Sequence, residues 1–346
     1  MRAILALCAL AAACVASEPQ QSAQATPPPE VIEAQEEAQA APEPQPPPPI
    51  LDPTIAPPMA QGTTGSVVAP TLLPLNAPPP PSTLSLNCAG AFAQGGVALC
   101  RTLPGARIVV DGTDRGAASS EGWAVIGFDR DAPREAIVEA RAGGETARQT
   151  FAILPREFSI QRVDGLPPQT VSPTDPAVVA RIARERTIKN RGFSSRADAQ
   201  GWLDSFIWPV EGRISGSWGN QRVLNGEPRS PHYGVDIAMP AGTAIRAPAG
   251  GVVSLAEPDL YLEGGLVLID HGQGLISMYL HMSRLDVREG DRVTQGQVIG
   301  AVGARGRATG PHLCWRMRWR DRQVDPSLAI LALAEARRTL ASGPAQ

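Results

Sequence analysis

Alternation of apolar and polar residues runs through most of the chain beyond residue 84, and it predicts β-strands rather than helices. Up to Leu166 the apolar runs are short and are separated by turn residues such as Asp111-Gly112, a spacing typical of β sandwiches. The predicted strands cover residues 106–110, 123–128, 136–142, 147–154 and 158–163. These runs carry no cluster of His, Cys or carboxylates, so we predict a small β-sandwich-like domain over residues 84–170 that packs or binds.

In two segments the apolar residues recur at the spacing of an α-helix. Apolar residues between 178 and 183 recur at helix spacing, and Asp175-Pro176 is a typical helix start. The pattern predicts a helical connector over residues 173–205, interrupted at Gly192. From residue 326 an amphipathic pattern predicts a packing helix that leads into a terminal segment, residues 331–346.

The first residues have the composition of an export signal. Arg2 precedes an apolar run over residues 3–15, which is too short to span a bilayer as a permanent helix. The sequence therefore predicts that the chain is exported, with residues 1–16 as the signal. Two alternatives stay open. Either Ala11-Ala12-Ala13-Cys14 is a lipobox and Cys14 is lipidated in the outer membrane, or an ordinary peptidase cleaves near Ala16 and the protein is free in the periplasm.

Between the signal and the first predicted strand the chain is rich in Pro, Ala, Gln and Glu. Such a composition cannot bury enough apolar surface to fold, and it favours extended polyproline II. We predict a disordered tether over residues 17–83, which spaces the rest of the chain from a membrane anchor. The net charge of −3 excludes a nucleic-acid partner, because no basic excess is present to neutralise phosphates.

Cysteine usage agrees with export. Cys88 and Cys100 lie close together in the predicted β domain, where an oxidising compartment would allow a local disulfide. Cys314 has no partner and needs another role.

All four histidines lie between His232 and His312, within the last third of the chain. Over residues 312–319, apolar residues alternate with His312, Cys314 and two arginines, so His312 and Cys314 face the same polar space. The same alternation over residues 276–282 predicts that Ser277, Tyr279 and His281 share one face. Five residues of types that zinc or a general base requires can thus converge from three strands: His232, Asp236, His281, His312 and Cys314.

This constellation resembles the lysostaphin-type, or LytM-like, zinc metallopeptidases. Their marks are HxxxD, a lone catalytic His and a late HxH, matched here at His232, Asp236, His281 and His312, with Cys314 in place of the last His. The resemblance covers roughly 120 residues, from about 206 to 330. The flanking matches are Trp208-Pro209-Val210, residues 247–253, and residues 296–300 before Gly303.

The resemblance implies a mainly β chain whose last domain is an antiparallel sandwich or barrel-like sheet of the duplicated hybrid motif type, with the metal in a groove. It implies zinc held by His232, Asp236 and Cys314, and a catalytic pair, His281 and His312, that handles the attacking water and the oxyanion. The implied activity is that of a metalloendopeptidase that hydrolyses peptide cross-links of peptidoglycan.

The thiolate leaves alternatives open. A Cys314 thiolate and the Asp236 carboxylate would together cancel the charge of the zinc ion, which would then be a weaker Lewis acid. The alternative is a degenerate domain that activates a wall amidase or another division partner, or that anchors the wall without hydrolysis. Three other residues near these motifs were also considered. Arg222 and Arg229 bind acidic wall peptide or are solvated, and His271 is structural in a hairpin turn.

Overall fold

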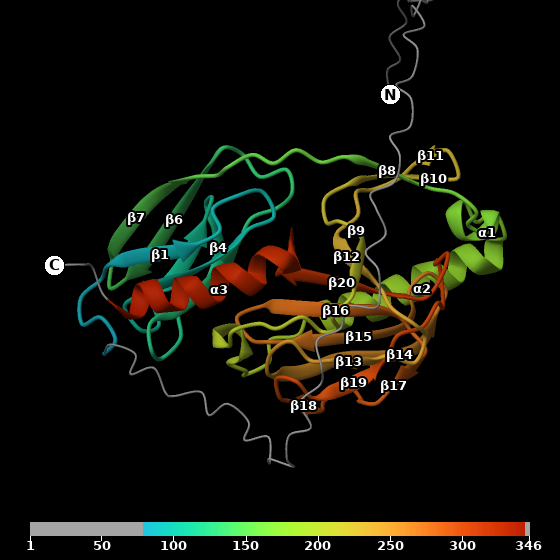
Figure 1. Cartoon of the computed structure of the whole chain (residues 1–346). Helices are drawn as coiled ribbons and strands as arrows, with labels where there is room; N and C mark the ends of the chain where they lie inside the picture. Colours follow the sequence, from blue (N-terminus) through green and yellow to red (C-terminus); the bar gives the residue numbers. More distant parts are fainter. Residues whose placement is uncertain (1–78, 343–346) are drawn as a thin grey trace, which may run out of the picture. The chain divides into compact units, whose positions relative to one another are not determined.

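The computed structural model describes residues 79–342. Cys14, the signal segment and nearly all of the tether predicted from the sequence lie outside the described residues. Within them the chain is mainly β, with antiparallel sheets and three α-helices, as the sequence predicts (Figure 1). None of the helices in the described part is both long and apolar enough to cross a membrane.

Two antiparallel sheets form the N-terminal part. Their inward residues, among them Leu99, Ile126, Ile108 and Val138, contribute to one hydrophobic core, which is the arrangement of a β sandwich. Cys88 and Cys100 lie opposite each other on neighbouring strands and are joined by a disulfide. The first sheet has the order β1 (Leu86–Gly90), β2 (Val97–Thr102), β5 (Trp123–Gly127), and the second has the order β4 (Thr113–Ala117), β3 (Arg107–Val110), β6 (Glu135–Ala142), β7 (Glu145–Ala152).

The C-terminal helix returns to these N-terminal strands. Helix α3 (Pro326–Ala341) packs along β1 and β2, and Figure 1 shows it in red beside β1. Its N-cap is the buried Asp325, whose side chain accepts from the Ser327 amide and pairs with Arg156 at 2.9 Å. The amphipathic helix expected from residue 326 is therefore present.

The last strand of the predicted N-terminal domain pairs with the C-terminal region. Strand β8 (Ile160–Val163) lies parallel to β10 (Gln221–Leu224), and β11 (Glu227–Pro228) completes a small sheet. The short helix α1 (Pro168–Val171) follows β8. This pairing brings Gln161 and Val163 to the region that holds His232.

The helical connector is shorter than the sequence predicts. Helix α2 (Pro176–Phe193) follows the N-cap Asp175, as expected, and ends one residue beyond Gly192. Between residues 194 and 205 the described chain has one helical turn, the 3-10 segment η1 (Gly201–Leu203). The helix thus ends within one residue of the predicted interruption at Gly192. A Cβ there would lie 2.8–2.9 Å from Leu268 and Leu255, so glycine lets α2 approach the sheet closely. The predicted interruption therefore agrees with the end of α2 to within one residue, whereas this close packing could not be predicted from helix propensity.

An antiparallel sheet dominates the C-terminal part, with buried residues on both of its faces. One face packs into the core that also includes Trp315 and Tyr279, and the other packs under α2. The sheet has the order β18 (Arg292–Val293), β14 (Gly251–Leu260), β15 (Gly264–Asp270), β16 (Leu275–Met282), β20 (His312–Trp319), β12 (Gly234–Ala238), β9 (Arg213–Gly216), with β21 (Arg322–Val324) beside β20. A separate sheet has the order β13 (Ala244–Arg246), β19 (Val298–Ala301), β17 (Arg284–Leu285).

His271 is a structural residue of the β15–β16 turn. It is fully buried, its Nδ1–H donates to the Gly250 carbonyl at 2.7 Å, and its Nε2 accepts from the Ser277 hydroxyl at 2.7 Å. Burial lowers the pKa of His271 below its ordinary value. The imidazole is therefore neutral in the folded protein at pH values at which the unfolded chain takes up a proton.

We expect the free energy of unfolding to fall as the pH is lowered from 7.5 to 5. The unfolded state then binds more protons than the folded state, which costs up to about 1.4 kcal/mol per pH unit for each extra proton. The stabilisation from His271 is complete above the ordinary histidine pKa and is lost below it. Urea denaturation of the wild type and of His271→Gln at several pH values measures this. The variant should be less stable at pH 7.5 and less dependent on pH; equal slopes would contradict the assignment.

Candidate metal centre

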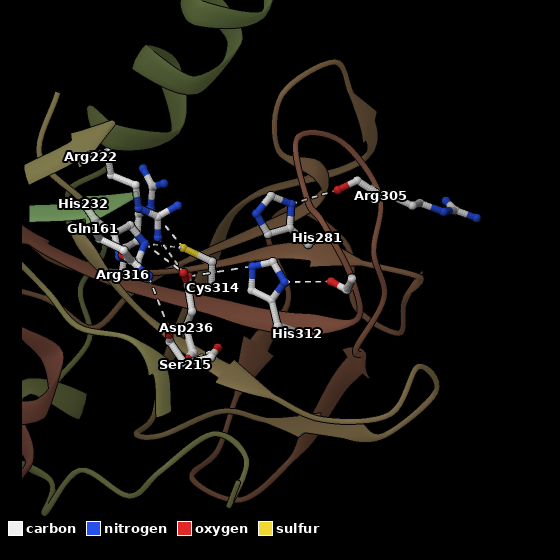
Figure 2. Close-up of polar contacts among 11 residues, drawn as sticks. Gln161, Ser215, Arg222, His232, Asp236, His281, Arg305, His312, Cys314 and Arg316 are labelled. Atoms are coloured by element: carbon white, nitrogen blue, oxygen red, sulfur yellow. Dashed lines mark hydrogen bonds and ion pairs between the residues drawn. The ribbon is translucent and has the colours of Figure 1, made fainter. Parts of the chain in front are cut away.

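A groove of about 320 Å³ contains all five site residues predicted from the sequence. Figure 2 shows them converging on one place, with His281 and His312 on one side of Cys314 and Arg222 and Arg316 on the other. We use "the groove" for the space lined by Gln161, Val163, Leu166, Arg213, Ser215, Arg222, Leu224, His232, Asp236, Ala238, Leu262, Glu263, Leu280, His281, Arg307, Ala308, Thr309, Gly310, Pro311, His312, Cys314 and Arg316.

Strand pairing explains why two of the sequence motifs meet. In the antiparallel pair β12–β20, Asp236 lies opposite Cys314 and Ala238 lies opposite His312. Side chains opposite each other in such a pair share a face. A register shift at Asp236 on the β9 side marks a bulge, and Gly216 leaves room there, since a Cβ would lie 2.5 Å from Asp236 Oδ2.

His281 reaches the groove by a different route from the one predicted. Leu280 is the register partner of Cys314 and shares its face, whereas Tyr279 points into the core on the other side of the sheet. Strict alternation would therefore turn His281 away from the groove. His281 has φ of 65°, and this left-handed backbone breaks the alternation at the end of β16. The prediction that Ser277, Tyr279 and His281 share one face agrees with Ser277 and Tyr279, whose hydroxyls lie 2.7 Å apart, and is wrong for His281 for this reason.

Three donor atoms of the groove form a cluster with the dimensions of a metal site. His232 Nε2 lies 3.1 Å from Asp236 Oδ1 and 3.4 Å from Cys314 Sγ, and the three atoms lie within 4.8 Å of one another. Atoms bound tetrahedrally to zinc lie roughly 3.3 to 3.6 Å apart at the usual bond lengths. Asp236 Oδ1 is buried and has no hydrogen-bond partner among residues 79–342. Imidazole, carboxylate and thiolate are donors that zinc binds, so the residues present fit this metal.

Two arginines contact these same donors. Arg222 Nη2 donates to Asp236 Oδ2 at 2.6 Å, and Arg316 Nε donates to Cys314 Sγ at 3.4 Å. Arg222 is thus engaged inside the groove and is not merely solvated. Burial would raise the pKa of Asp236, but the contacts with His232 and Arg222 outweigh it and lower the pKa. Asp236 is therefore ionised, and its Oδ1 remains available to a cation.

Cys314 behaves differently from Asp236. Burial raises the pKa of the Cys314 thiol to about 12, although the Arg316 charge acts in the opposite direction. Without a cation the sulfur therefore carries its proton at neutral pH. A coordinating thiol loses that proton, so metal binding at this site would release one.

The two remaining histidines are oriented by backbone carbonyls. His281 Nδ1–H donates to the Arg305 carbonyl at 2.8 Å, and His312 Nδ1–H donates to the Gly310 carbonyl at 2.9 Å. These bonds leave Nε2 as the basic nitrogen of each neutral ring. The ring centroids are 4.8 Å apart, and His312 Nε2 lies 3.7 Å from Asp236 Oδ1. Burial, with the neighbouring His312, lowers the pKa of His281 to about 3.

Comparisons with known proteins agree with this geometry. A family model described as peptidase family M23 matches residues 230–326. The peptidoglycan DD-endopeptidase ShyA of Vibrio cholerae is 37% identical over 132 residues, which make up 37% of this chain and 30% of ShyA. The cell division protein DipM of Caulobacter vibrioides is 33% identical over 131 residues, or 36% of this chain and 21% of DipM. A crystal structure from Pseudomonas aeruginosa assigned to M23 is 32% identical with a TM-score of 0.53, and the match covers 69% of this chain and 94% of that one.

The chain belongs to peptidase family M23. The resemblance to lysostaphin-type peptidases predicted from the motifs is thereby confirmed. The segment matched by the M23 model includes His232, Asp236, His281, His312 and Cys314. This M23 chain spans less than a third of the length of ShyA or DipM in these matches, so their activities are not transferred to the whole protein.

Some groove residues were not singled out from the sequence. Arg316 lies two positions after Cys314 on β20; the alternation placed it on the same face as Cys314 but gave it no role. Arg307 and Glu263 lie outside the main motifs, in or next to loops, and no periodic pattern marks them. Gln161 enters the M23 groove through the pairing of β8 with β10, two segments far apart in the sequence.

Proposed function

We propose that the protein is a zinc-dependent endopeptidase that hydrolyses peptide cross-links of peptidoglycan. The observation that carries this proposal is the convergence of His232 Nε2, Asp236 Oδ1 and Cys314 Sγ within 4.8 Å, beside the paired imidazoles of His281 and His312. The M23 membership supports a peptidase, and the name of the relative ShyA supports peptidoglycan as the substrate.

The proposal assigns zinc to His232, Asp236 and Cys314. When bound, zinc would supply a Lewis acid to the scissile carbonyl and to the attacking water. The chain itself manages the protons. His312 Nε2 accepts a proton from water, because the bond from Nδ1–H to the Gly310 carbonyl leaves Nε2 as the free basic nitrogen. The same nitrogen then donates that proton to the leaving amine. His281, with its pKa of about 3, stays neutral and helps to position the water.

The first experiment measures metal and activity together on the purified protein. We expect about one zinc per chain, since three ligands and an open position describe a catalytic site. We also expect release of muropeptides from purified peptidoglycan, which a chelator should abolish and added zinc restore. A folded chain that binds no zinc under zinc-replete conditions would overturn the metal assignment, and bound zinc without any peptide release would overturn the activity.

A second candidate is a non-catalytic activator of a wall amidase, or a protein that only binds the wall. The arginine partners favour it, because they contact Asp236 Oδ2 and the Cys314 sulfur without a metal. Stimulation of a purified amidase by the protein, with no peptide release of its own, would support this second function over the first.

We propose that the protein works outside the cytoplasm, in the periplasm. The apolar run over residues 3–15 and the Cys88–Cys100 disulfide support export, since disulfides persist in oxidising compartments. Lipidation of Cys14 would attach the chain to the outer membrane. Metabolic labelling with a fatty-acid analogue should mark the wild type and leave Cys14→Ser unlabelled.

A further inference from the structure

The side chains that line the groove include more arginines than carboxylates. Four of its lining residues are arginines, namely Arg213, Arg222, Arg307 and Arg316, whereas its lining acids are Asp236 and Glu263. Glu263 already forms an ion pair with Lys189, and Asp236 contacts His232 and Arg222. Among the lining residues the structure thus leaves guanidinium groups without a matching carboxylate.

Arg307 is the arginine whose charge is least balanced. Arg222 pairs with Asp236 and Arg316 contacts Cys314, but the one hydrogen bond recorded from the Arg307 side chain goes to the Thr170 carbonyl, at 3.4 Å. Within residues 79–342 no acidic side chain forms an ion pair with Arg307. Burial lowers the pKa of Arg307 and the neighbouring charge of Arg316 lowers it further, while the Glu263 carboxylate acts in the opposite direction. Half-buried like charges of this kind favour an anion between them.

Unsatisfied polar atoms gather at the same place. Five side chains that line the groove have a buried nitrogen or oxygen without a hydrogen-bond partner in the described structure. They are Gln161, Arg222, His232, Asp236 and Glu263. Buried polar atoms are normally paired, so such a concentration indicates a polar ligand. The metal would satisfy Asp236 Oδ1, whereas the Arg222 Nε donor requires an acceptor.

We propose that Arg307, with Arg316 beside it, binds a carboxylate of the substrate peptide next to the scissile bond. This inference rests on the proposed peptidase function and narrows its substrate class to peptides that carry a free carboxylate at that position. A guanidinium pairs with a carboxylate through two parallel hydrogen bonds, which hold the peptide in a fixed orientation. Such an orientation places the scissile carbonyl relative to His281 and His312.

The first test measures binding without cleavage, in full-length His312→Ala protein. The probes are a synthetic muropeptide with free carboxylates and the same peptide with carboxamides in their place. We expect the carboxylate peptide to bind roughly tenfold to a hundredfold more tightly, and the difference to shrink as salt is added. Equal affinities for the two peptides would overturn the proposal.

The second test compares two arginine variants in the same host. Arg307→Gln should lose most of the preference for the carboxylate. The matched control is Arg162→Gln, which removes the same charge from β8, next to the lining residues Gln161 and Val163 but on the opposite, exposed face of the strand. A loss of preference that is equal in both variants, or absent from both, would overturn the role of Arg307.

Measuring the zinc content distinguishes a failure of the carboxylate site from a failure of the proposed peptidase function. Arg307→Gln should bind as much zinc as the wild type, because Arg307 contacts none of the three proposed ligands. Reduced zinc in this variant would assign Arg307 to the metal centre and contradict the proposal. If the wild type released no peptides yet preferred the carboxylate probe, the activity would fail while the carboxylate site stood.

Discussion

Cys314→Ala should lose its zinc and, with it, all release of muropeptides. The substitution removes one of three donor atoms that lie within 4.8 Å of one another, and His232 and Asp236 alone leave too few ligands for tight binding. It also leaves the Arg316 guanidinium facing the metal position without the sulfur that it now contacts. Elemental analysis of the purified variant should therefore show far less than one zinc per chain.

Two further measurements separate ligation from damage to the fold. Cobalt substituted into the wild type should give a thiolate-to-metal absorption band in the near ultraviolet, and Cys314→Ala should lack it. Cys314→His should bind the metal again without this band, because imidazole is also a zinc ligand. A cobalt-loaded wild type without the band would show that the Cys314 sulfur is not a ligand.

The arginines bear on whether a thiolate site can catalyse. A carboxylate and a thiolate together cancel the charge of zinc, which by itself weakens the Lewis acid. Arg222 and Arg316 return two positive charges to the same donors, and Arg316 donates directly to the sulfur. A hydrogen bond to a ligand atom tunes its donation to the metal. The surroundings of Cys314 therefore offset part of the electrostatic cost of replacing a histidine.

The sequence could predict those parts of the site that depend on local periodicity. Along β20 the alternation places Trp315 and Met317 in the core and His312 and Cys314 in the groove, as predicted. The reason is physical: in a strand buried on both faces, each register position has a fixed side. The mainly β fold could be predicted from the same signal.

The remaining features depend on backbone exceptions and on distant contacts. The left-handed φ of His281 interrupts the alternation of side-chain directions that was expected along β16. The parallel pairing of β8 with β10 and the return of α3 to β1 join segments far apart in the chain, and no local pattern encodes which partner a strand selects. The bond from Arg222 to Asp236 has the same origin, since it follows from where β10 lies relative to β12.

His312→Ala should retain zinc and lose catalysis. Its ring is not one of the three clustered donors, so the metal content should stay near one per chain. Its Nε2 is the base that the proposed reaction requires, because the Gly310 carbonyl accepts from Nδ1–H and leaves Nε2 free to take a proton. Removing a positioned general base typically lowers kcat by about a hundred- to ten-thousandfold. Initial rates on purified peptidoglycan, with zinc measured on the same sample, test this.

Comparing His312→Ala with His281→Ala distinguishes the roles of the two histidines. Burial keeps His281 neutral throughout the working pH range, so its loss should lower the rate without moving the acid limb of the pH profile. Both variants should bind zinc and keep the wild-type circular dichroism. If His312→Ala kept full activity, or if it lost zinc as Cys314→Ala is expected to, the division between ligands and proton-transferring groups would be wrong.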